Sequence, residues 1–312
     1  MSKTNKSYSN THIRNTVYVG IGIGILANIV LLLFHISLCI TGQKTKPTDL
    51  PIGLLALIHL VMLVINGIIA ADIFTPQGGR WDDLTCKLLI YLYRLMRDFS
   101  TCTTCLLSVL QVITLSPRSS CLAKFKDKSS HQKLIFLLFL CVNSYFRSHL
   151  LISIITTHNL TSDNFLYITE SFSLLPMSFF LRDIFVILFT FREVTFIGIM
   201  TISNGYMVAL LCRHRRLSQH LHRISLSPIS SPELRATQTI LLLLSCFVVM
   251  SILDIIITYA RIIVNHDPIF YCIQILVVHS YASFSPLVFL ATEKRIITIL
   301  RYMWGRTMHI SH

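Results

Sequence analysis

Ionisable residues lie inside apolar stretches of this sequence, and they are the side chains best placed to do chemistry. Arg94 and Asp98 are four residues apart, as are Tyr93 and Arg97, so each pair shares one side of a helix. Arg192, Glu193, Asp254 and His279 also lie in such stretches, and so do Lys87, Arg147 and His149. Two interpretations stay open: a polar pocket that binds a small molecule, or internal ion pairs that only fix helix packing.

The sequence contains no catalytic or metal-binding motif. It has no HExxH, no GxSxG and no Walker loop, and its acids are spread over different segments. Cys102 and Cys105 form a CxxC, but the pair lies within an apolar stretch, which favours packing over redox or metal chemistry. We therefore expect no enzyme, no metal and no cofactor.

The elements that carry these residues are apolar enough to cross a membrane. Of the 312 residues, 53% are hydrophobic and only 13% are charged, against about a quarter charged in soluble domains. A helix needs about 20 residues to span a bilayer core of about 30 Å. The sequence predicts an all-α membrane protein of one domain, residues 1–312, with seven transmembrane helices at 17–40, 50–71, 85–115, 134–157, 187–212, 236–260 and 270–291.

The basic residues predict how the chain is oriented. Lys and Arg concentrate in the segments that are cytoplasmic if the N-terminus is outside, as the positive-inside rule requires. The net charge of +13 thus needs no nucleic-acid partner, although these loops can contact anionic lipid. Asn5 and Asn159 begin glycosylation sequons, and both fall on the side that this topology makes extracellular.

Proline positions predict where helices start, stop and bend. Pro117 is expected to end the third helix, and Ser231-Pro232 to begin the sixth with a capping hydroxyl and a proline in the first turn. Pro286 lies inside the seventh helix and removes one backbone hydrogen bond. We expect a neighbouring group to satisfy the freed carbonyl, so that the helix bends without breaking.

Several long strings carry a family resemblance. LLIYLYRLMR at 88–97, ITLSPRSSCLAKFK at 113–126, LLPMSFFLR at 174–182 and IQILVVHSYASFSPLVFLATEKR at 273–295 resemble vomeronasal type-1 receptors. The resemblance runs from Asn28 to Arg301. It favours this family over two alternatives, a bitter-taste-type chemoreceptor and a membrane transporter or channel.

The resemblance implies a G-protein-coupled pheromone receptor of the plasma membrane, with a rhodopsin-like bundle and an extracellular N-terminus. A small volatile or semi-volatile molecule would bind in the outer half, and a heterotrimeric G protein of the inhibitory class would bind the cytoplasmic loops. Together with Asp254, chosen from its place in the sixth helix, the expected ligand-binding residues are Leu89, Tyr93, Arg94, Arg97, Tyr271, Ile275 and His279.

The chain departs from the family pattern in its outer cysteines. Similar receptors carry a cysteine directly before the SLLPMS string that can bond the cysteine opening the third helix. Here that position is Phe172, so Cys86 lacks its usual partner and its disulfide pairing is unknown. Cys272, at the outer end of the seventh helix, is an alternative partner for Cys86.

Overall fold

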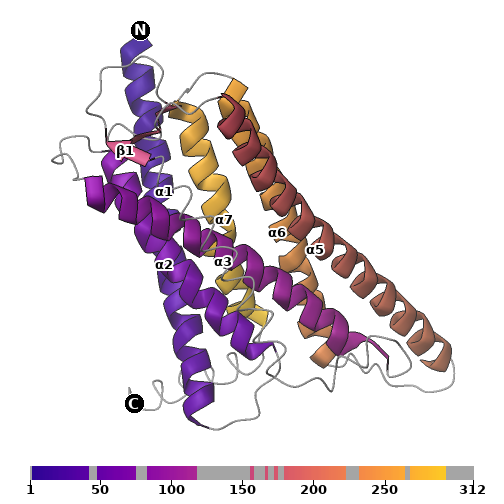
Figure 1. The fold of residues 1–312 in the computed structure, drawn as a ribbon. Coiled ribbons are helices and arrows are strands. Elements are labelled where there is room, and N and C mark those ends of the chain that lie inside the picture. Colours follow the sequence, from indigo (N-terminus) through magenta and orange to yellow (C-terminus); the bar gives the residue numbers. More distant parts are fainter. Residues whose placement is uncertain are drawn as a thin grey trace, which may run out of the picture.

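The computed structural model describes residues 2–41, 48–74, 83–117, 155–157, 166–167, 172–174, 179–222, 232–263 and 268–292. Long helices dominate this part of the chain (Figure 1). They are α1 Ser2–Ile40, α2 Asp49–Phe74, α3 Asp83–Leu115, α5 Phe179–His222, α6 Pro232–Ile263 and α7 Pro268–Thr292. The predicted fourth helix, 134–157, lies outside the described residues except for 155–157.

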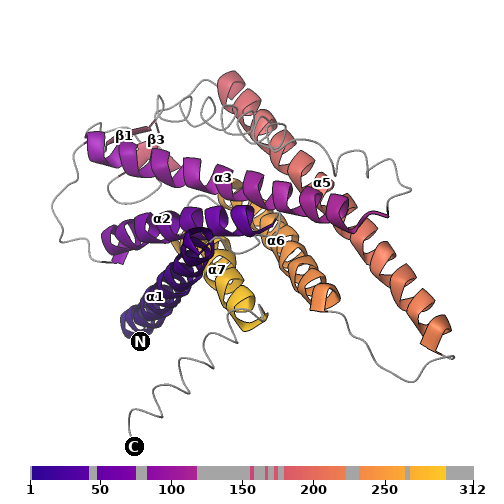
Figure 2. The same ribbon diagram turned by 90° about the horizontal axis from the view of Figure 1, so that it is seen from below.

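The helices are arranged as a ring. In order, α1 packs on α2, α2 on α3, α3 on α5, α5 on α6 and α6 on α7, and α7 returns to α1 (Figures 1 and 2). Two further contacts, α2 with α7 and α3 with α6, cross the ring. Side chains of α2, α3, α6 and α7 are therefore the ones that meet in its interior.

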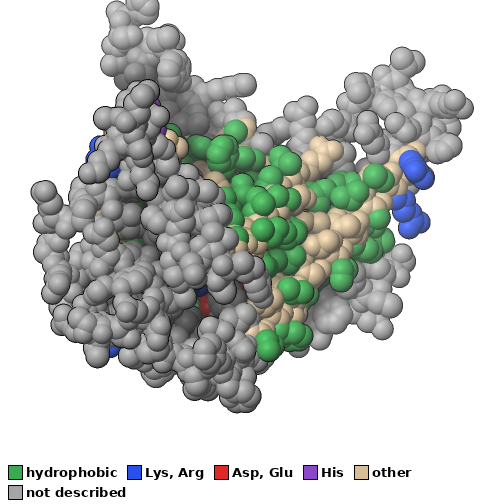
Figure 3. Space-filling model, turned by 90° about the horizontal axis from the view of Figure 1, so that it is seen from above, with side chains coloured by type: hydrophobic (Ala, Val, Ile, Leu, Met, Phe, Trp, Pro, Cys, Tyr) green, Lys and Arg blue, Asp and Glu red, His purple; other side chains and the backbone are tan. Residues whose placement is uncertain are grey.

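Five of the described helices are long and apolar enough to cross a membrane: 14–40, 49–71, 87–115, 190–213 and 237–257. Their outward faces carry exposed large hydrophobic residues, such as Leu26 on α1 and Ile202 on α5. Figure 3 shows one such hydrophobic surface, with Lys and Arg side chains at its edge. Exposed apolar surface on this scale fits contact with lipid and not with water.

Two helices extend well beyond the apolar segments that predicted them. α1 begins at Ser2 and not at residue 17, and α5 runs from Phe179 to His222 where 187–212 was predicted. Neither 2–16 nor 213–222 contains proline or glycine, so nothing interrupts the backbone hydrogen bonds. The basic residues after Cys212, which we expected in a loop, accordingly lie on the last turns of α5.

The proline predictions for two helix ends are confirmed. α3 ends at Leu115, two residues before Pro117, and α6 begins at Pro232. α7 continues through Pro286 without interruption. Glycine has a separate role where α1 meets α7, because a Cβ added at Gly24 would lie 2.5 Å from Ser283 Oγ. Only glycine permits so close an approach of these two helices.

Three short strands add to the helices. β1 Ile155–Thr157, β2 Leu166–Tyr167 and β3 Phe172–Leu174 form an antiparallel sheet in the order β1-β3-β2, and β1 lies against α3. We predicted residues 155–157 as the end of the fourth helix, and this prediction was wrong. The sequence there is Ile-Thr-Thr, and β-branched residues lose less side-chain freedom in a strand than in a helix.

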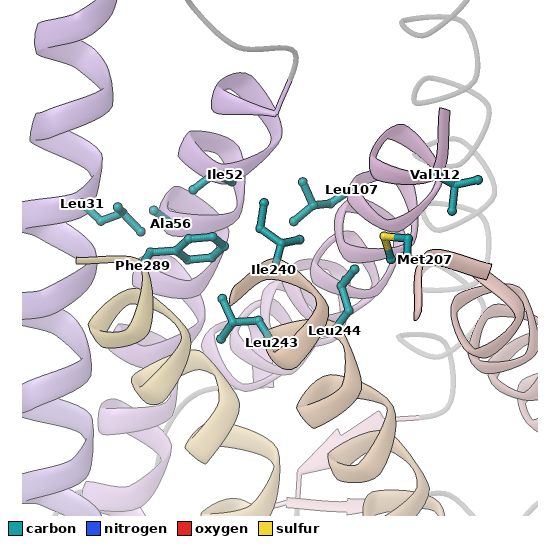
Figure 4. Packing of buried hydrophobic residues seen from close by; sticks show 10 residues of the cluster. All are labelled: Leu31, Ile52, Ala56, Leu107, Val112, Met207, Ile240, Leu243, Leu244 and Phe289. Atoms are coloured by element: carbon teal, nitrogen blue, oxygen red, sulfur yellow. The ribbon is translucent and has the colours of Figure 1, made fainter. Parts of the chain in front are cut away.

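The largest buried hydrophobic cluster draws on all six described helices. Figure 4 shows its members pointing toward one another between the helices. They are Leu31, Ile52, Ala56, Leu107, Val112, Met207, Ile240, Leu243, Leu244 and Phe289. This packed layer fixes the helices relative to one another below the polar groups described next.

Candidate functional site

A cavity of about 50 Å³ lies in the ring interior, bounded by α2, α3, α5, α6 and α7. Its wall combines apolar and sulfur-containing side chains with hydroxyls and charged groups. The lining residues are Met62, Arg97, Ser100, Thr101, Glu193, Phe247, Met250, Ser251, Asp254 and Tyr281. Six of the ten lining residues are polar or charged and four are apolar or aromatic, so the wall offers a small molecule both hydrogen-bonding groups and apolar contact.

Two ion pairs join the helices around this cavity, and one of them, Arg97–Asp254, lines it. Arg97 on α3 pairs with Asp254 on α6, and Arg192 Nη1 on α5 lies 2.9 Å from Asp98 Oδ1 on α3. Both carboxylates are nearly inaccessible, with side-chain exposures of 6% for Asp254 and 4% for Asp98. We call these four residues the charged cluster. It joins α3 to both helices that face it across the cavity.

Arg192 is held by more than its carboxylate partner. Its guanidinium lies 5.1 Å from the centre of the Phe196 ring, one turn further along α5, and its Nη2 lies 4.0 Å from Cys102 Sγ. Glu193, the next residue, is buried and lines the cavity. A planar guanidinium can face a carboxylate and stack on an aromatic ring at once, which suits arginine and not lysine to this position.

A second polar group, without formal charge pairs, lies on the other side of α3. His59 on α2 forms hydrogen bonds with Ser100 Oγ at 2.9 Å through Nε2 and with Ser285 Oγ at 3.4 Å through Nδ1. The edge of the His59 ring also meets Tyr281, with centroids 5.6 Å apart. One imidazole thus links α2, α3 and α7.

The carbonyl freed by Pro286 finds its partner on α1. Proline at 286 cannot donate to the carbonyl four residues earlier, which is that of Ala282. Asn28 Nδ2 donates to this oxygen at 3.0 Å and to Gly24 O at 2.8 Å. The expectation that a neighbouring group would satisfy the carbonyl is confirmed. We call Asn28, His59, Ser100 and Ser285 the neutral cluster.

His279 differs from both clusters. Its side chain is 5% exposed, and its ring meets the Tyr93 ring at a centroid distance of 5.7 Å. Within the described part of the chain, neither Nδ1 nor Nε2 has a hydrogen-bond partner. A buried imidazole with two open nitrogens is a group that a ligand or a water can engage.

The structure brings two of the eight predicted binding residues into the cavity wall. These are Arg97 and Asp254, while Tyr93 and His279 are in ring contact with each other. Leu89 and Arg94 are half-buried on α3, and Arg94 interacts with neighbouring residues. The side chains of Tyr271 and Ile275, on α7, lie outside the described residues.

Several lining residues were not predicted from the sequence. Ser100 and Thr101 follow Arg97 by three and four positions, and Met250 and Ser251 precede Asp254 by four and three. Such spacing places each set on one helix face. The residues one helical turn from Arg97 and Asp254 were therefore predictable as lining residues from the sequence.

The structure describes only some of the cysteines. Cys102 and Cys105 are buried free cysteines, as the packing interpretation of the CxxC predicts. No three His, Cys, Asp or Glu side chains gather around a possible metal position in the described ranges. The side chains of Cys86, Cys272, Phe172 and Asn5 lie outside the described residues, as does Asn159 altogether.

Comparison with known proteins gives one consistent result. Residues 11–302 match the model of the vomeronasal organ pheromone receptor family. Vomeronasal type-1 receptor 94 of Rattus norvegicus is 53% identical over 311 residues, which cover 99% of this chain and 95% of that protein. Vomeronasal type-1 receptor 45 of Mus musculus is 52% identical over 302 residues, covering 96% of this chain and 95% of that protein.

Proposed function

Because the chain belongs to the vomeronasal organ pheromone receptor family, we propose that this pheromone receptor binds a small molecule in the cavity lined by the Arg97–Asp254 pair. Its function is reception and G-protein signalling, not enzymatic catalysis. Family membership also decides against the bitter-taste-type receptor and the transporter or channel considered above.

The observation that carries the binding proposal is the Arg97–Asp254 pair in the cavity wall. The pair joins α3 to α6, and both side chains face the space that a ligand would enter. A ligand that contacts either partner can therefore shift the balance between two arrangements of these helices. Such differential contact is what a ligand needs to change a receptor's conformation.

The membrane arrangement is part of the proposal. Seven helices with an extracellular N-terminus, in the plasma membrane, would place the cavity in the outer half of the bundle. The basic last turns of α5, with Arg213 and Arg216, would then lie in the cytoplasm. There they can contact anionic lipid and a heterotrimeric G protein, for which we propose the inhibitory class.

The rival interpretation is that the ion pairs only fix helix packing. A larger side chain in the cavity distinguishes ligand binding from a purely structural role of the ion pairs. Helix packing tolerates a filled cavity, whereas a ligand can no longer enter it. Ser251→Leu places a larger side chain at the lining, and Ser245→Leu is the matched control on the exposed face of α6. We expect Ser251→Leu to lower the potency of an activating ligand at least tenfold, with Ser245→Leu unchanged.

The measurement is a calcium response in cells that co-express the receptor and a G protein, scaled to receptor at the cell surface. The same measurement on Arg94→Met tests a predicted binding residue. We expect a shift in ligand potency with a normal amount of receptor at the cell surface. Equal potency of Ser251→Leu and Ser245→Leu, at equal surface level, would refute the cavity as the binding site.

A further inference from the structure

His59 on α2 contacts the wall of the proposed ligand cavity from behind. It is 1% exposed, and within the described part of the chain it is not among the residues that line the cavity. Met62, three positions later on the same face of α2, does line it, so His59 lies one helical turn further from the cavity. Any effect of this imidazole on a ligand must therefore pass through residues of the wall.

Two residues of the wall are in contact with His59, and they come from different helices. Ser100 on α3 shares a hydrogen bond of 2.9 Å with His59 Nε2. Tyr281 on α7 meets the edge of the His59 ring, at a centroid distance of 5.6 Å and an interplanar angle of 89°. One side chain of α2 thus supports two wall residues of two other helices.

Tyr281 is enclosed on its other sides as well. Its ring meets Phe247 of α6 at 4.7 Å between centroids, with an interplanar angle of 73°. Its hydroxyl is hydrogen-bonded to Thr104 of α3. Because the Thr104 hydroxyl already donates to Ser100 O at 2.8 Å, it accepts the bond from Tyr281. His59 completes this enclosure, which leaves the Tyr281 ring little freedom to turn.

The two nitrogens of His59 have different surroundings. Nε2 meets Ser100, which lines the cavity, at 2.9 Å, whereas Nδ1 meets Ser285, which does not, at 3.4 Å. A hydroxyl can donate or accept, so both bonds form with a neutral imidazole in either tautomer. The shorter bond therefore leads to the ligand site, and the longer one joins the ring to α7.

We propose that His59 is a positioning residue of the ligand cavity, which holds Ser100 and Tyr281 where a bound ligand needs them. The inference rests on the proposed function, since it concerns the same cavity. Binding groups held in place from behind lose less freedom when a ligand arrives. Without the imidazole, the Ser100 hydroxyl can turn to a carbonyl of its own helix, as that of Thr104 does, and the Tyr281 ring gains room to turn.

Glutamine and asparagine at position 59 separate the two hydrogen bonds. The amide of glutamine reaches about as far as Nε2 of histidine, and the amide of asparagine about as far as Nδ1. His59→Gln therefore keeps a partner for Ser100, and His59→Asn keeps one for Ser285. Both variants lose the ring and gain one amide, so each is the matched control of the other.

The measurement is the calcium response of cells that co-express the full-length receptor and a G protein. The probes are medium-chain aliphatic ketones, alcohols and amines. We expect the probes to be about tenfold less potent on His59→Asn than on His59→Gln, the effect of one hydrogen bond at the wall. Surface level and thermal unfolding should be similar, since each variant keeps one bond. Adding Ser100→Ala to both should abolish the difference, because the bond that distinguishes them has lost its partner.

His59→Phe gives a second measurement that does not depend on the amides. It keeps a ring against Tyr281, and the released serine hydroxyls can bond carbonyls of their own helices. Potency should fall about tenfold, and Ser100→Ala should lower it less in this background than in the wild type. His35→Phe is the control and should leave potency unchanged, because the His35 ring bonds Leu31 O in its own helix.

The outcomes separate this inference from the function on which it rests. Equal potency on His59→Asn and His59→Gln, or full additivity of His59→Phe and Ser100→Ala, would overturn the positioning role while the cavity stayed the binding site. Absence of all three His59 variants from the cell surface would make His59 a structural residue and overturn the role as well. If no probe activated or thermally stabilised the wild-type receptor, the proposed cavity would fall together with this inference.

Discussion

The charged cluster and the neutral cluster meet on α3 but hold the bundle by different means. Arg97, Asp98, Arg192 and Asp254 join α3 to α5 and α6 through ion pairs. The neutral cluster joins α2 and α3 to α7 through His59, and α1 to α7 through Asn28. Ser100 belongs to the neutral cluster and also lines the cavity, so the two regions share one wall.

The difference separates a part of the receptor that we expect a ligand to rearrange from a part that we expect to keep its arrangement. Ion pairs act strongly in a low-dielectric interior, and they can be exchanged for other partners. The neutral hydrogen bonds satisfy buried backbone and side-chain groups between helices, as at Ala282 O. We therefore expect α5 and α6 to move relative to α3 on activation, while α1, α2 and α7 serve as the frame.

The largest expected effect is from removing one charge of the more buried of these two pairs. Asp98→Asn leaves Arg192 without its carboxylate, and breaking a buried pair in this way costs about 3–5 kcal/mol. Thermal unfolding of purified receptor should show the loss. The double variant Asp98→Asn with Arg192→Met should recover much of it, because the guanidinium that had lost its partner is removed as well. An equal loss in the double variant would contradict the pairing.

The Arg97–Asp254 pair should be less costly to break but more important for signalling. Arg97 is 18% exposed and lines the cavity, so water can partly replace its partner. Asp254→Asn should destabilise the receptor by about 1–3 kcal/mol and change the response without ligand. Exchanging the two residues, as Arg97→Asp with Asp254→Arg, should restore stability. Basal activity identical in all three receptors would remove the pair from the activation mechanism.

In the neutral cluster, the Asn28 hydrogen bond to Ala282 can be tested against the proline that makes it necessary. Asn28→Leu leaves the Ala282 carbonyl unpaired and should cost about 1–3 kcal/mol. Pro286→Ala restores a backbone N–H for this carbonyl, so the cost of Asn28→Leu should be smaller in that background. Additive effects of the two substitutions in unfolding measurements would contradict the assignment.

The smallest effect is expected at Ser285. Its hydroxyl lies 3.4 Å from His59 Nδ1, a long hydrogen bond, while Ser100 holds the other nitrogen at 2.9 Å. Ser285→Ala should therefore cost about 0.5–1.5 kcal/mol and leave ligand potency unchanged. If Ser285→Ala changed ligand potency more than Asp254→Asn does, the charged cluster would not be the part that responds to the ligand.

Much of the fold followed from the sequence because its signals are local. Apolar length gave the membrane segments at α2, α3 and α6, and proline gave the end of α3 and the start of α6. The strings shared with vomeronasal type-1 receptors gave the family. Where the local signal was weak the prediction failed, as at Ile155–Thr157, where β-branched residues form a strand against α3.

Only the tertiary structure decided which partner each polar residue has. From spacing alone, Asp98 could pair with Arg94 on its own helix, but the structure also places Arg192 of α5 at its carboxylate. Spacing did not show that Arg97 pairs with Asp254. It also did not show that Asn28 donates a hydrogen bond to the carbonyl freed by Pro286. That neither nitrogen of His279 has a hydrogen-bond partner in the described part of the chain likewise came only from the structure. Helical periodicity fixes which residues share a face, whereas the rotation and approach of neighbouring helices, set by their packing, fix what that face meets.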